Sequence, residues 1–491
     1  MLCASKIINP SRRVILYSSS SSSSRITTKR WNTTNANIPT TTRMYDMVIS
    51  GGGIVGAALA CRIAGSTNPL MNTRRIACLE AFKPKSFEEV TNTSNIDLRT
   101  YAIAPKSARL LEEIGVWNRV VESDRCQSFS SMQVWDATGS ADGFINFKHD
   151  SESLGYIVEN NVLQAALYER MMELQDENKL DVLCPSTVEN IEEVNVGGYV
   201  VKTSTEEEDL FTNLLVAADG GNSKVRNLLG FGNWGWKYEQ NAIVATVKLD
   251  MDELSMGEEA EETIDFLSGR LCKTWQRFLP TGPVAILPLW DGMASIVWSN
   301  TIENTKMLKE CTKEEFVLKL NEAFQENNIG SELPSFLPPN PLSLLQSSKP
   351  NFIKAPTITE LCSPVVSFPL QFSQATTYAK KGVALIGDAA HTVHPMAGQG
   401  LNLGLGDVGV LSNLLEEVND VGGNFGDANM LEKYEKERKE ANVIMGASLD
   451  LLKRVFDSQS VPLQVARTVG MATLNSTPLV KERIAKYAMG L

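Results

Sequence analysis

The chain has 491 residues, of which 43% are hydrophobic and 21% are charged, a composition typical of a globular protein. This length predicts more than one domain. The formal net charge of −12 argues against a nucleic-acid partner, because an acidic surface is repelled by phosphates. No apolar run approaches the roughly 18 residues that a membrane-spanning helix needs. The eight cysteines are scattered without a C-x-x-C pair, which argues against disulfide frameworks and zinc sites.

Residues 1–43 differ in composition from the rest of the chain. They hold seven Lys or Arg residues and no Asp or Glu, together with a run of serines at 18–24. Such a segment is typical of a mitochondrial transit peptide, and we predict one over residues 1–43. A disordered tail or a wrongly assigned start is the alternative. Without those seven positive charges, the remaining residues have a formal net charge of −19.

The first predicted ordered unit is a βαβ motif. The apolar run 44–50 is expected to form a buried strand, glycines follow it, and residues 54–64 have helical composition. Residues 75–80 then form a second predicted strand that ends in an acid, Glu80.

Later elements alternate between helical and strand patterns. The middle of the chain is expected to form longer antiparallel strands, and the last 65 or so residues are expected to be helical. The individual predictions are helices at 104–115 and 160–174, a strand meander over 181–219, strands at 242–249, 284–289 and 294–298, a surface connection over 330–362, and a βα unit that starts at 382.

The glycines after the first strand fit the dinucleotide-binding pattern G-x-G-x-x-G between a strand and a helix. Gly51 permits the tight turn, Gly53 lets the backbone approach a pyrophosphate, and Gly56 lets the helix lie close to the strand. The helix N-terminus then offers N–H groups to the phosphates. Glu80 is placed to bind an adenosine ribose, although a solvated strand end is the alternative. The motif alone does not separate FAD from NAD.

Two further stretches resemble the D-G and G-D motifs of the flavin-dependent aromatic hydroxylases, and they favour FAD. The first is Ala-Asp-Gly-Gly at 218–221, continued to 226; the second is Gly-Asp-Ala-Ala-His at 387–391, followed by a Pro and by Gly-Gln-Gly. The resemblance implies a p-hydroxybenzoate hydroxylase-like α/β fold. It comprises a Rossmann-like FAD-binding domain, an inserted mixed or antiparallel-sheet substrate domain, and C-terminal helices. The expected bounds are 44–121, 156–235 and 364–420 for the FAD-binding domain, 122–155 and 236–363 for the substrate domain, and 421–491 for the helices.

The Gly-Asp motif at 387–391 also indicates a role from its residues alone. A predicted strand that ends in Gly387 and Asp388 puts a carboxylate where ligands of such sheets collect, within reach of ribityl hydroxyls. Pro395 stiffens the following loop, and the glycines after it permit close backbone approach. The next helix can point free N–H groups at the flavin. We therefore predict a catalytic loop formed by Pro395, Gly398, Gln399 and Gly400.

Other residues are assigned to the cofactor by the resemblance. Arg99 resembles the family arginine that approaches the flavin, and Gln164 resembles a polar helix residue that touches the cofactor. Both residue types are usually surface groups, which is the alternative. Asp219 resembles a cofactor contact and can also be a helix N-cap. The complete set of predicted cofactor contacts is Gly51, Gly53, Gly56, Glu80, Arg99, Gln164, Asp219, Gly220, Gly387, Asp388 and Asn402.

Three patterns carry weaker alternatives. His391 and His394 have an i, i+3 spacing that invites a metal site, but a histidine packed in the loop beside the cofactor is the preferred interpretation, and we predict no metal. Arg226 is expected to neutralise a helix or to bind phosphate. Trp234 and Trp236 partly match a halogenase motif that lacks its Ile and Pro here, so they are expected in the core or in the wall of a substrate pocket.

Three stretches most resemble the ubiquinone-biosynthesis hydroxylases: residues 156–160, 275–283 and 391–404. The resemblance implies hydroxylation at C5 of a polyprenylated 4-hydroxybenzoate-type ring, with O2 and a flavin C4a-hydroperoxide. It also implies a peripheral location on the matrix side of the mitochondrial inner membrane, and association with other enzymes of ubiquinone biosynthesis. No residue pattern indicates a general base.

The electron donor and the reaction class retain alternatives. The mitochondrial branch resembles enzymes reduced by ferredoxin and ferredoxin reductase, although an acidic body needs a local basic patch to attract an acidic ferredoxin. An aromatic hydroxylase that uses NAD(P)H directly is the alternative donor arrangement. An isoprenoid flavin reductase, or a non-catalytic scaffold stabilised by FAD, is the alternative function.

Overall fold

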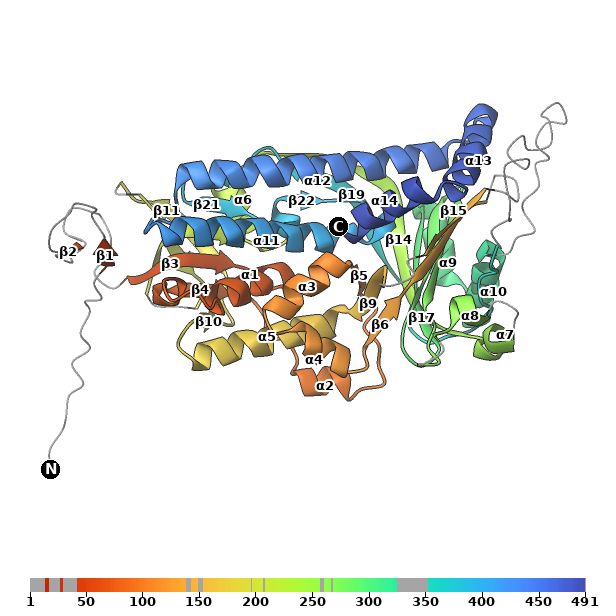
Figure 1. The fold of residues 1–491 in the computed structure, drawn as a ribbon, viewed down its shortest axis with the longest axis horizontal. Coiled ribbons are helices and arrows are strands. Elements are labelled where there is room, and N and C mark those ends of the chain that lie inside the picture. The colour runs from red at the N-terminus through yellow and green to blue at the C-terminus, as the bar shows by residue number, and fades with distance from the viewer. Residues whose placement is uncertain are drawn as a thin grey trace.

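The architecture is built on two large β-sheets that lie side by side, bridged by helices from the C-terminal end of the chain (Figure 1). It is taken from a computed structural model of the whole chain. The structure describes residues 14–16, 27–29, 42–137, 143–148, 153–195, 197–205, 208–256, 260–265, 268–324 and 352–490.

The first sheet has a parallel centre made of fully buried apolar strands. Its main path runs β10-β4-β3-β13-β12-β11, with β21 alongside β13 and β20 alongside β21. Strands β10, β4, β3, β13 and β21 are parallel to one another, whereas β12 pairs antiparallel with β13 and β11, and β20 pairs antiparallel with β21. Their bounds are β3 Arg43–Ser50, β4 Ile76–Leu79, β10 Asp181–Leu183, β11 Val188–Glu193, β12 Tyr199–Thr203, β13 Leu210–Ala217, β20 Ala379–Lys380 and β21 Val383–Leu385.

Helices cover this sheet because parallel strands need both faces buried. Helix α1 (Ile54–Ala64) is almost entirely buried between the sheet, α5 (Asn160–Asp176) and α11 (Gln399–Asp420). Shorter elements surround them: η2 Met71–Thr73, α2 Phe87–Thr91, α3 Pro105–Glu113, α4 Trp117–Glu122, α6 Lys224–Leu228, η5 Gly387–Ala389 and η6 Pro395–Ala397.

The second sheet is largely antiparallel and carries its own core. Its order is β22-β19-β14-β17-β16-β15-β7-β8, with β18 paired to β14. One face packs on α10, through Trp275 and Ile296 of the sheet and Phe316 and Leu320 of the helix. The bounds are β7 Ser131–Asp136, β8 Phe144–Lys148, β14 Asn233–Leu249, β15 Lys273–Leu279, β16 Gly282–Pro288, β17 Met293–Thr301, β18 Ile358–Leu361, β19 Val366–Ala375, β22 His391–Thr392, α7 Met251–Met256, α8 Ala260–Thr263, α9 Ile302–Glu310 and α10 Lys313–Phe324.

A small sheet and the C-terminal helices join the two halves. The small sheet has the order β5-β9-β6, made of Thr100–Ile103, Gly155–Glu159 and Cys126–Phe129. Helix α12 (Ala428–Asp457) runs along the top of both sheets in Figure 1, and α13 (Val461–Asn475) and α14 (Pro478–Met489) follow it. Two contacts fix this end on the second sheet: the buried Arg467–Asp136 ion pair at 2.8 Å, and Phe456 stacked on Phe278.

The predicted fold class is confirmed, including the inserted sheet and the helical C-terminus. Trp234 and Trp236 were expected in the core or in the wall of a substrate pocket. They are 45% and 38% exposed on β14, where they lie against Phe372, so the core location is wrong and the pocket wall stays a prediction. The 330–362 connection falls mostly outside the described residues. So does most of the predicted transit peptide 1–43, in which the described residues are the pair β1 (Val14–Leu16) and β2 (Thr27–Lys29) and residues 42 and 43. In the described part of the chain, no helix combines the length and apolarity needed to cross a bilayer.

Candidate functional site

Four parallel strands of the first sheet end at the same level. Their last residues are paired in register: Ser50 of β3 with Leu79 of β4 and with Ala217 of β13, and Ala217 in turn with Leu385 of β21. Every predicted motif therefore leaves the sheet at one edge, although the motifs are far apart in the sequence. The carboxyl ends of parallel strands are where sheets of this kind bind ligands.

The glycine turn after β3 has the geometry that a dinucleotide requires. Gly51 adopts a φ of +104°, and a Cβ on Gly56 would lie 1.9 Å from the carbonyl oxygen of Gly51, so neither position accepts a side chain. Gly53 is different, because no protein atom lies within 4 Å of the place its Cβ would take. Gly53 is the N-cap of α1, and no side chain caps this helix. The first N–H groups of α1 are therefore available to phosphate oxygens.

Glu80 closes this turn from the end of β4. Its Oε2 accepts a hydrogen bond from the Gly52 N–H at 2.7 Å, and its Oε1 accepts one from the Phe82 N–H at 3.1 Å. The carboxylate thus orders the glycine turn, a role that a simple solvated strand end would not have. Its contact with a ribose stays a prediction.

Asp219, at the end of β13, combines a capping role with a free acceptor. Its Oδ2 accepts hydrogen bonds from the N–H groups of Lys224 and Val225 at 2.7 and 3.2 Å, at the start of α6. Its Oδ1 is buried without a protein partner, which is the state expected of a group that awaits a ligand donor. Gly220 follows with a φ of +81° and open space beside its Cα.

Arg226 connects the D-G motif to the G-D motif. Its guanidinium donates to the carbonyl oxygen of Gly221 at 2.6 Å and to that of Ala389 at 2.9 Å. It therefore fixes two cofactor loops against each other. The expectation that it only neutralises a helix or binds phosphate missed this role.

Asp388, the carboxylate of the G-D motif, is accessible to solvent. The residue is exposed, but surrounding protein desolvates its carboxyl and raises the pKa, while the charges of His391 and Arg99 act in the opposite direction. Gly387 before it has a φ of +58°, and its Cα faces Val55 of α1, with only 3.3 Å between a built Cβ and the Val55 methyl groups. A side chain at 387 would thus push on the dinucleotide helix.

The loop 395–400 leads directly into α11. Pro395 occupies the first position of η6, and Gly398 adopts a left-handed φ of +60° as the N-cap of α11, again without a side-chain cap. A Cβ on Gly400 would meet no protein atom within 4 Å, so the first turn of α11, which also contains Gln399, has open space on that side. The N–H groups of this turn are placed to bind an anionic or carbonyl group.

Asn402 uses its side chain within the protein. Its Nδ2 donates to the carbonyl oxygens of Ala102 and Gly398 at 2.8 and 3.2 Å, and its Oδ1 accepts from the Ala104 N–H at 2.9 Å. These bonds tie α11 to β5 and the start of α3. Both amide hydrogens of Asn402 are therefore used within the protein, and its contact with the cofactor stays a prediction.

Arg99 and Gln164 are less closely defined. Arg99 is exposed at the start of β5, near enough to Asp388 for its charge to affect the carboxyl pKa, so it belongs to the same site. Gln164 is partly exposed on α5, which packs against α1. The roles of both residues stay predictions.

Comparison with known proteins agrees with this arrangement. The family described as FAD binding domain matches residues 88–336 and 346–445. The protein named ubiquinone biosynthesis monooxygenase COQ6, mitochondrial, from Danio rerio is 36% identical over 459 residues, covering 91% of this chain and 90% of the relative. The Homo sapiens protein of that name is 35% identical over 466 residues, with 91% and 93% coverage. This chain belongs to the COQ6 family of ubiquinone biosynthesis monooxygenases.

Solved structures show the same fold at lower identity. The p-nitrophenol 4-monooxygenase PnpA from Pseudomonas putida superposes with a TM-score of 0.65 at 15% identity, covering 91% of this chain and 98% of PnpA. PqsL from Pseudomonas aeruginosa, in complex with 2-aminobenzoylacetate, superposes with a TM-score of 0.63 at 19% identity, covering 87% and 99%.

The chain is an FAD-dependent monooxygenase. The site itself fits FAD: Gly53, Gly220 and Gly400 leave open spaces that a Cβ would fill, and the buried Asp219 Oδ1 lacks a partner. Uncapped N-termini of α1 and α11 offer N–H groups at two separate points of the site.

A buried network centred on Asp407 supports the G-D motif from behind. Asp407, on α11, accepts hydrogen bonds from the Gly387 N–H at 2.9 Å, from Arg438 Nε at 2.8 Å and from Asn442 Nδ2 at 3.1 Å, and its Oδ2 lies 2.6 Å from His391 Nε2. His391 therefore has a structural partner. Among the described residues, no cluster of His, Cys, Asp and Glu can hold a metal ion. Sequence reasoning missed Asp407, which carries no local motif of its own.

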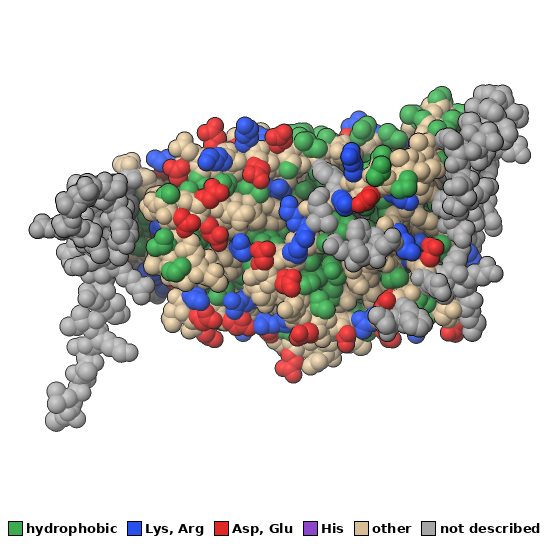
Figure 2. Space-filling model, in the orientation of Figure 1, with side chains coloured by type: hydrophobic (Ala, Val, Ile, Leu, Met, Phe, Trp, Pro, Cys, Tyr) green, Lys and Arg blue, Asp and Glu red, His purple; other side chains and the backbone are tan. Residues whose placement is uncertain are grey.

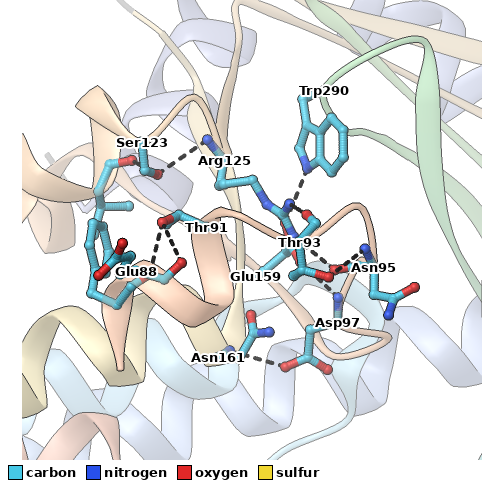
Figure 3. A network of polar contacts seen from close by, with 12 residues as sticks. Glu88, Thr91, Thr93, Asn95, Asp97, Ser123, Arg125, Glu159, Asn161 and Trp290 are labelled. Carbon is cyan, nitrogen blue, oxygen red and sulfur yellow. Dashed lines mark hydrogen bonds and ion pairs between the residues drawn. The ribbon is translucent and has the colours of Figure 1, made fainter. Parts of the chain in front are cut away.

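A second buried network holds the loop that leads to Arg99 (Figure 3). Arg125 and Glu159 form two hydrogen bonds, at 2.7 and 2.9 Å, and both side chains are almost fully buried. Trp290, from the β16–β17 connection, donates to Glu159 Oε1 at 3.1 Å and stacks on the Arg125 guanidinium. Arg125 also donates to the carbonyl oxygens of Thr93 and Asn95.

Hydrogen bonds of Glu159 and Asp97 connect this network to the backbone of Arg99. Glu159 Oε2 accepts from the Asp97 N–H at 2.7 Å, and Asp97 accepts from the N–H groups of Arg99 and Asn161, both at 3.0 Å. The Asn160 N–H closes the loop by donating to the Arg99 carbonyl oxygen. Glu159 lies in one of the stretches that resemble the family, but its partners are distant in sequence and were not predicted.

Proposed function

We propose that this monooxygenase hydroxylates C5 of a polyprenylated 4-hydroxybenzoate-type ring in ubiquinone biosynthesis. The observation that carries the proposal is the near full-length similarity to proteins named for ubiquinone biosynthesis, in a chain that keeps every motif at one sheet edge. The relatives are also named mitochondrial. We therefore propose a mitochondrial location, peripheral on the matrix side of the inner membrane, in association with other enzymes of the pathway.

The chemistry is divided between the cofactor and the chain. Bound FAD, once reduced, supplies the activation of O2 for transfer of one oxygen atom to the ring. The Gly51–Gly53 turn and the α1 N-terminus would bind the dinucleotide, and Asp219 and Asp388 would accept hydrogen bonds from its hydroxyl groups. The first turn of α11 is proposed to hold the flavin ring through backbone N–H groups. Pro395, Gly398, Gln399 and Gly400 form this loop, and Arg99, whose charge affects Asp388, would approach the flavin.

The remaining task of the protein is orientation and exclusion of water. Hydroxylation needs the ring carbon held within attack distance of the activated oxygen, and it needs a site dry enough to prevent loss of H2O2. The two buried networks serve the first requirement, because Asp407 fixes the Gly387 turn and Glu159 fixes the Arg99 loop.

We propose ferredoxin, reduced by ferredoxin reductase, as the electron donor. The test is product analysis by mass spectrometry, with the FAD-loaded chain, a short-tailed prenyl 4-hydroxybenzoate, 18O2, and either a ferredoxin system or NADPH. One 18O atom at ring C5 with ferredoxin alone is the expected result. Label with NADPH alone would retain the hydroxylase and reject the proposed donor. Flavin reduction without labelled product in both systems would reject this substrate class.

A further inference from the structure

We infer that the outer face of the C-terminal helices docks on an anionic phospholipid membrane. The face, named here the C-terminal face, consists of exposed apolar side chains on the end of α12, on α13 and on α14. Each of these side chains is between 40% and 75% exposed: Ile444, Leu451, Leu452, Val461, Leu463, Val469, Leu479, Val480 and Ile484. In Figure 2, hydrophobic side chains gather over the end of α12 and over α13, at the upper right.

The absence of charge on α13 separates this face from an ordinary solvated surface. The helix has one charged residue, Arg467, and that residue is buried in the ion pair with Asp136. Its exposed positions are apolar or small: Val461, Pro462, Leu463, Ala466, Val469 and Gly470, with Thr473 one turn further on. The first half of α12 contrasts with it, because its exposed positions include Glu432, Lys433, Lys436, Glu437 and Glu440.

The distribution of charge along the chain indicates which partner binds the C-terminal face. Residues 441–491 carry six Lys or Arg and three Asp or Glu, whereas residues 44–440 have a formal charge of −22. One of the six, Arg467, is buried and neutralised by Asp136, which leaves this segment an excess of two positive charges. The exposed cations next to the apolar face include Arg454, Arg483 and Lys486; Arg454 pairs with Asp450, and Lys486 pairs with Glu482. A basic apolar face on an acidic protein matches an anionic lipid surface. A second copy of the chain would instead bring two positive faces together.

The C-terminal face is joined to the flavin loop through the protein interior. Met396 of η6 is buried in one cluster with Phe456 of α12, Met471 of α13 and Phe278 of β15. Docking through α12 and α13 therefore holds the loop 395–400 close to the lipid surface. This gives a substrate with a prenyl tail in the bilayer a short path to the site, a consequence that rests on the proposed function, whereas the docking itself does not.

Vesicle flotation of the full-length FAD-loaded chain tests the docking. Vesicles of phosphatidylcholine alone are compared with vesicles that also contain phosphatidylglycerol or cardiolipin. Leu463→Glu combined with Val469→Glu places two charges on the outer face of α13. Its control is Val421→Glu, an apolar position that is 83% exposed beyond the opposite end of α12, roughly 45 Å along the helix axis. A second test uses the double variant Arg483→Gln and Lys486→Gln on α14. Its control is the double variant Lys433→Gln and Lys436→Gln on the first half of α12.

We expect the unaltered chain to bind anionic vesicles. At low salt, its affinity should fall at least tenfold in the α13 variant and about fivefold for each C-terminal cation that is removed. Both controls should bind like the unaltered chain, and bound FAD, read from its absorbance, should be equal in all variants. Failure of the unaltered chain to bind anionic vesicles, or equal loss in the controls, overturns the proposal. The proposal is also overturned if the α13 variant binds vesicles normally but no longer self-associates with rising concentration, or no longer captures a protein partner.

The outcome is independent of the proposed hydroxylation, although failure to bind vesicles would also count against the proposed peripheral location. Hydroxylation of a short-tailed, water-soluble substrate is measured on the same variants without vesicles. Loss of vesicle binding with unchanged hydroxylation supports the docking surface, and vesicle binding by a chain that fails to hydroxylate leaves the surface in place while rejecting the substrate.

Discussion

His391 Nε2 lies 2.6 Å from Asp407 Oδ2, and both side chains are fully buried. The same carboxylate oxygen accepts the Gly387 N–H at 2.9 Å. Asp407 therefore links the first turn of the G-D motif to the histidine that ends it, while Arg438 binds the other oxygen from α12. Desolvation would raise the Asp407 pKa, but the charges of His391 and Arg438 and their hydrogen bonds prevail and lower it, so the group stays ionised. The cofactor turn is thus held by an anion that never touches the cofactor.

Asp407→Asn should destabilise the protein by about 3–5 kcal/mol, because it leaves Arg438 buried without its counter-charge. It should also weaken FAD binding, since the Gly387 turn loses its anchor. Urea denaturation and FAD titration measure the two effects. Glu417→Gln, an exposed position on the same helix, is the control. Equal stability of the two variants would show that the network does not support the turn.

Two alanine substitutions in the glycine turn should differ in whether they reduce FAD affinity or the stability of the apoprotein. Gly53→Ala is compatible with the backbone, at φ −63°, and meets no protein atom, so the stability of the apoprotein should change by less than about 0.5 kcal/mol. Its FAD affinity should fall, because the new methyl group fills the space left for the pyrophosphate. Gly56→Ala places a carbon 1.9 Å from the Gly51 oxygen and should destabilise the apoprotein itself. Apoprotein unfolding and FAD fluorescence titration separate the two; unchanged FAD affinity in Gly53→Ala would contradict the assignment.

Glu159→Gln should loosen the loop that positions Arg99. The variant leaves the Arg125 guanidinium buried beside a neutral amide, which should cost about 3–5 kcal/mol of stability. Hydrogen exchange should rise in residues 93–99, whose backbone the pair holds. The double variant with Arg125→Met should be less destabilised than the sum of the single variants, because the two residues are directly coupled. Additive effects, with unchanged exchange at 93–99, would reject the coupling. Glu169→Gln, in a half-exposed pair with Arg119, serves as control.

The strand ends and glycine turns could be predicted because their signals are local. A buried apolar run followed by glycines predicts a strand that ends in a tight turn. Gly51, Gly387 and Gly398 do adopt the positive φ values that such turns need. The support behind them could not be predicted. Asp407 and Arg438 lie 31 residues apart on two helices, and Glu159 meets Trp290 across 131 residues. Such pairs depend on how elements meet in space, and neither periodicity nor motif spacing encodes that.

The side chain of Asn402 and the exposed tryptophans illustrate the same limit. The sequence placed Asn402 correctly at the start of a helix, but its amide bonds to β5 follow from the approach of a strand 300 residues away. Trp234 and Trp236 were expected in the core or in a pocket wall, yet β14 leaves them 45% and 38% exposed, which excludes the core. Local pattern predicts which element forms, whereas tertiary contacts decide what each side chain meets.

His394 makes the stability of the folded chain depend on pH. Its side chain is 1% exposed, its Nδ1 accepts the Met396 N–H at 3.2 Å, and its Nε2 is buried without a partner. Desolvation, reinforced by the charge of Lys453, lowers its pKa to about 4. Because the pKa in the unfolded chain is about 6.5, the folded state takes up fewer protons than the unfolded state between these values. The neutral form therefore contributes stability that is complete above pH 6.5 and is lost as the pH falls from 6.5 toward 4.

His394→Asn removes this titration while it keeps an acceptor near the Met396 N–H. Between pH 7.5 and 4.5, the unaltered chain should lose roughly 2–3 kcal/mol more unfolding free energy than the variant. Urea denaturation of both proteins at four pH values measures the difference, and His391 remains in both as an internal control. The loss should be accompanied by release of FAD, because His394 and Met396 belong to the loop that precedes α11. Parallel stability curves for the two proteins over this range would show that His394 does not titrate with a lowered pKa.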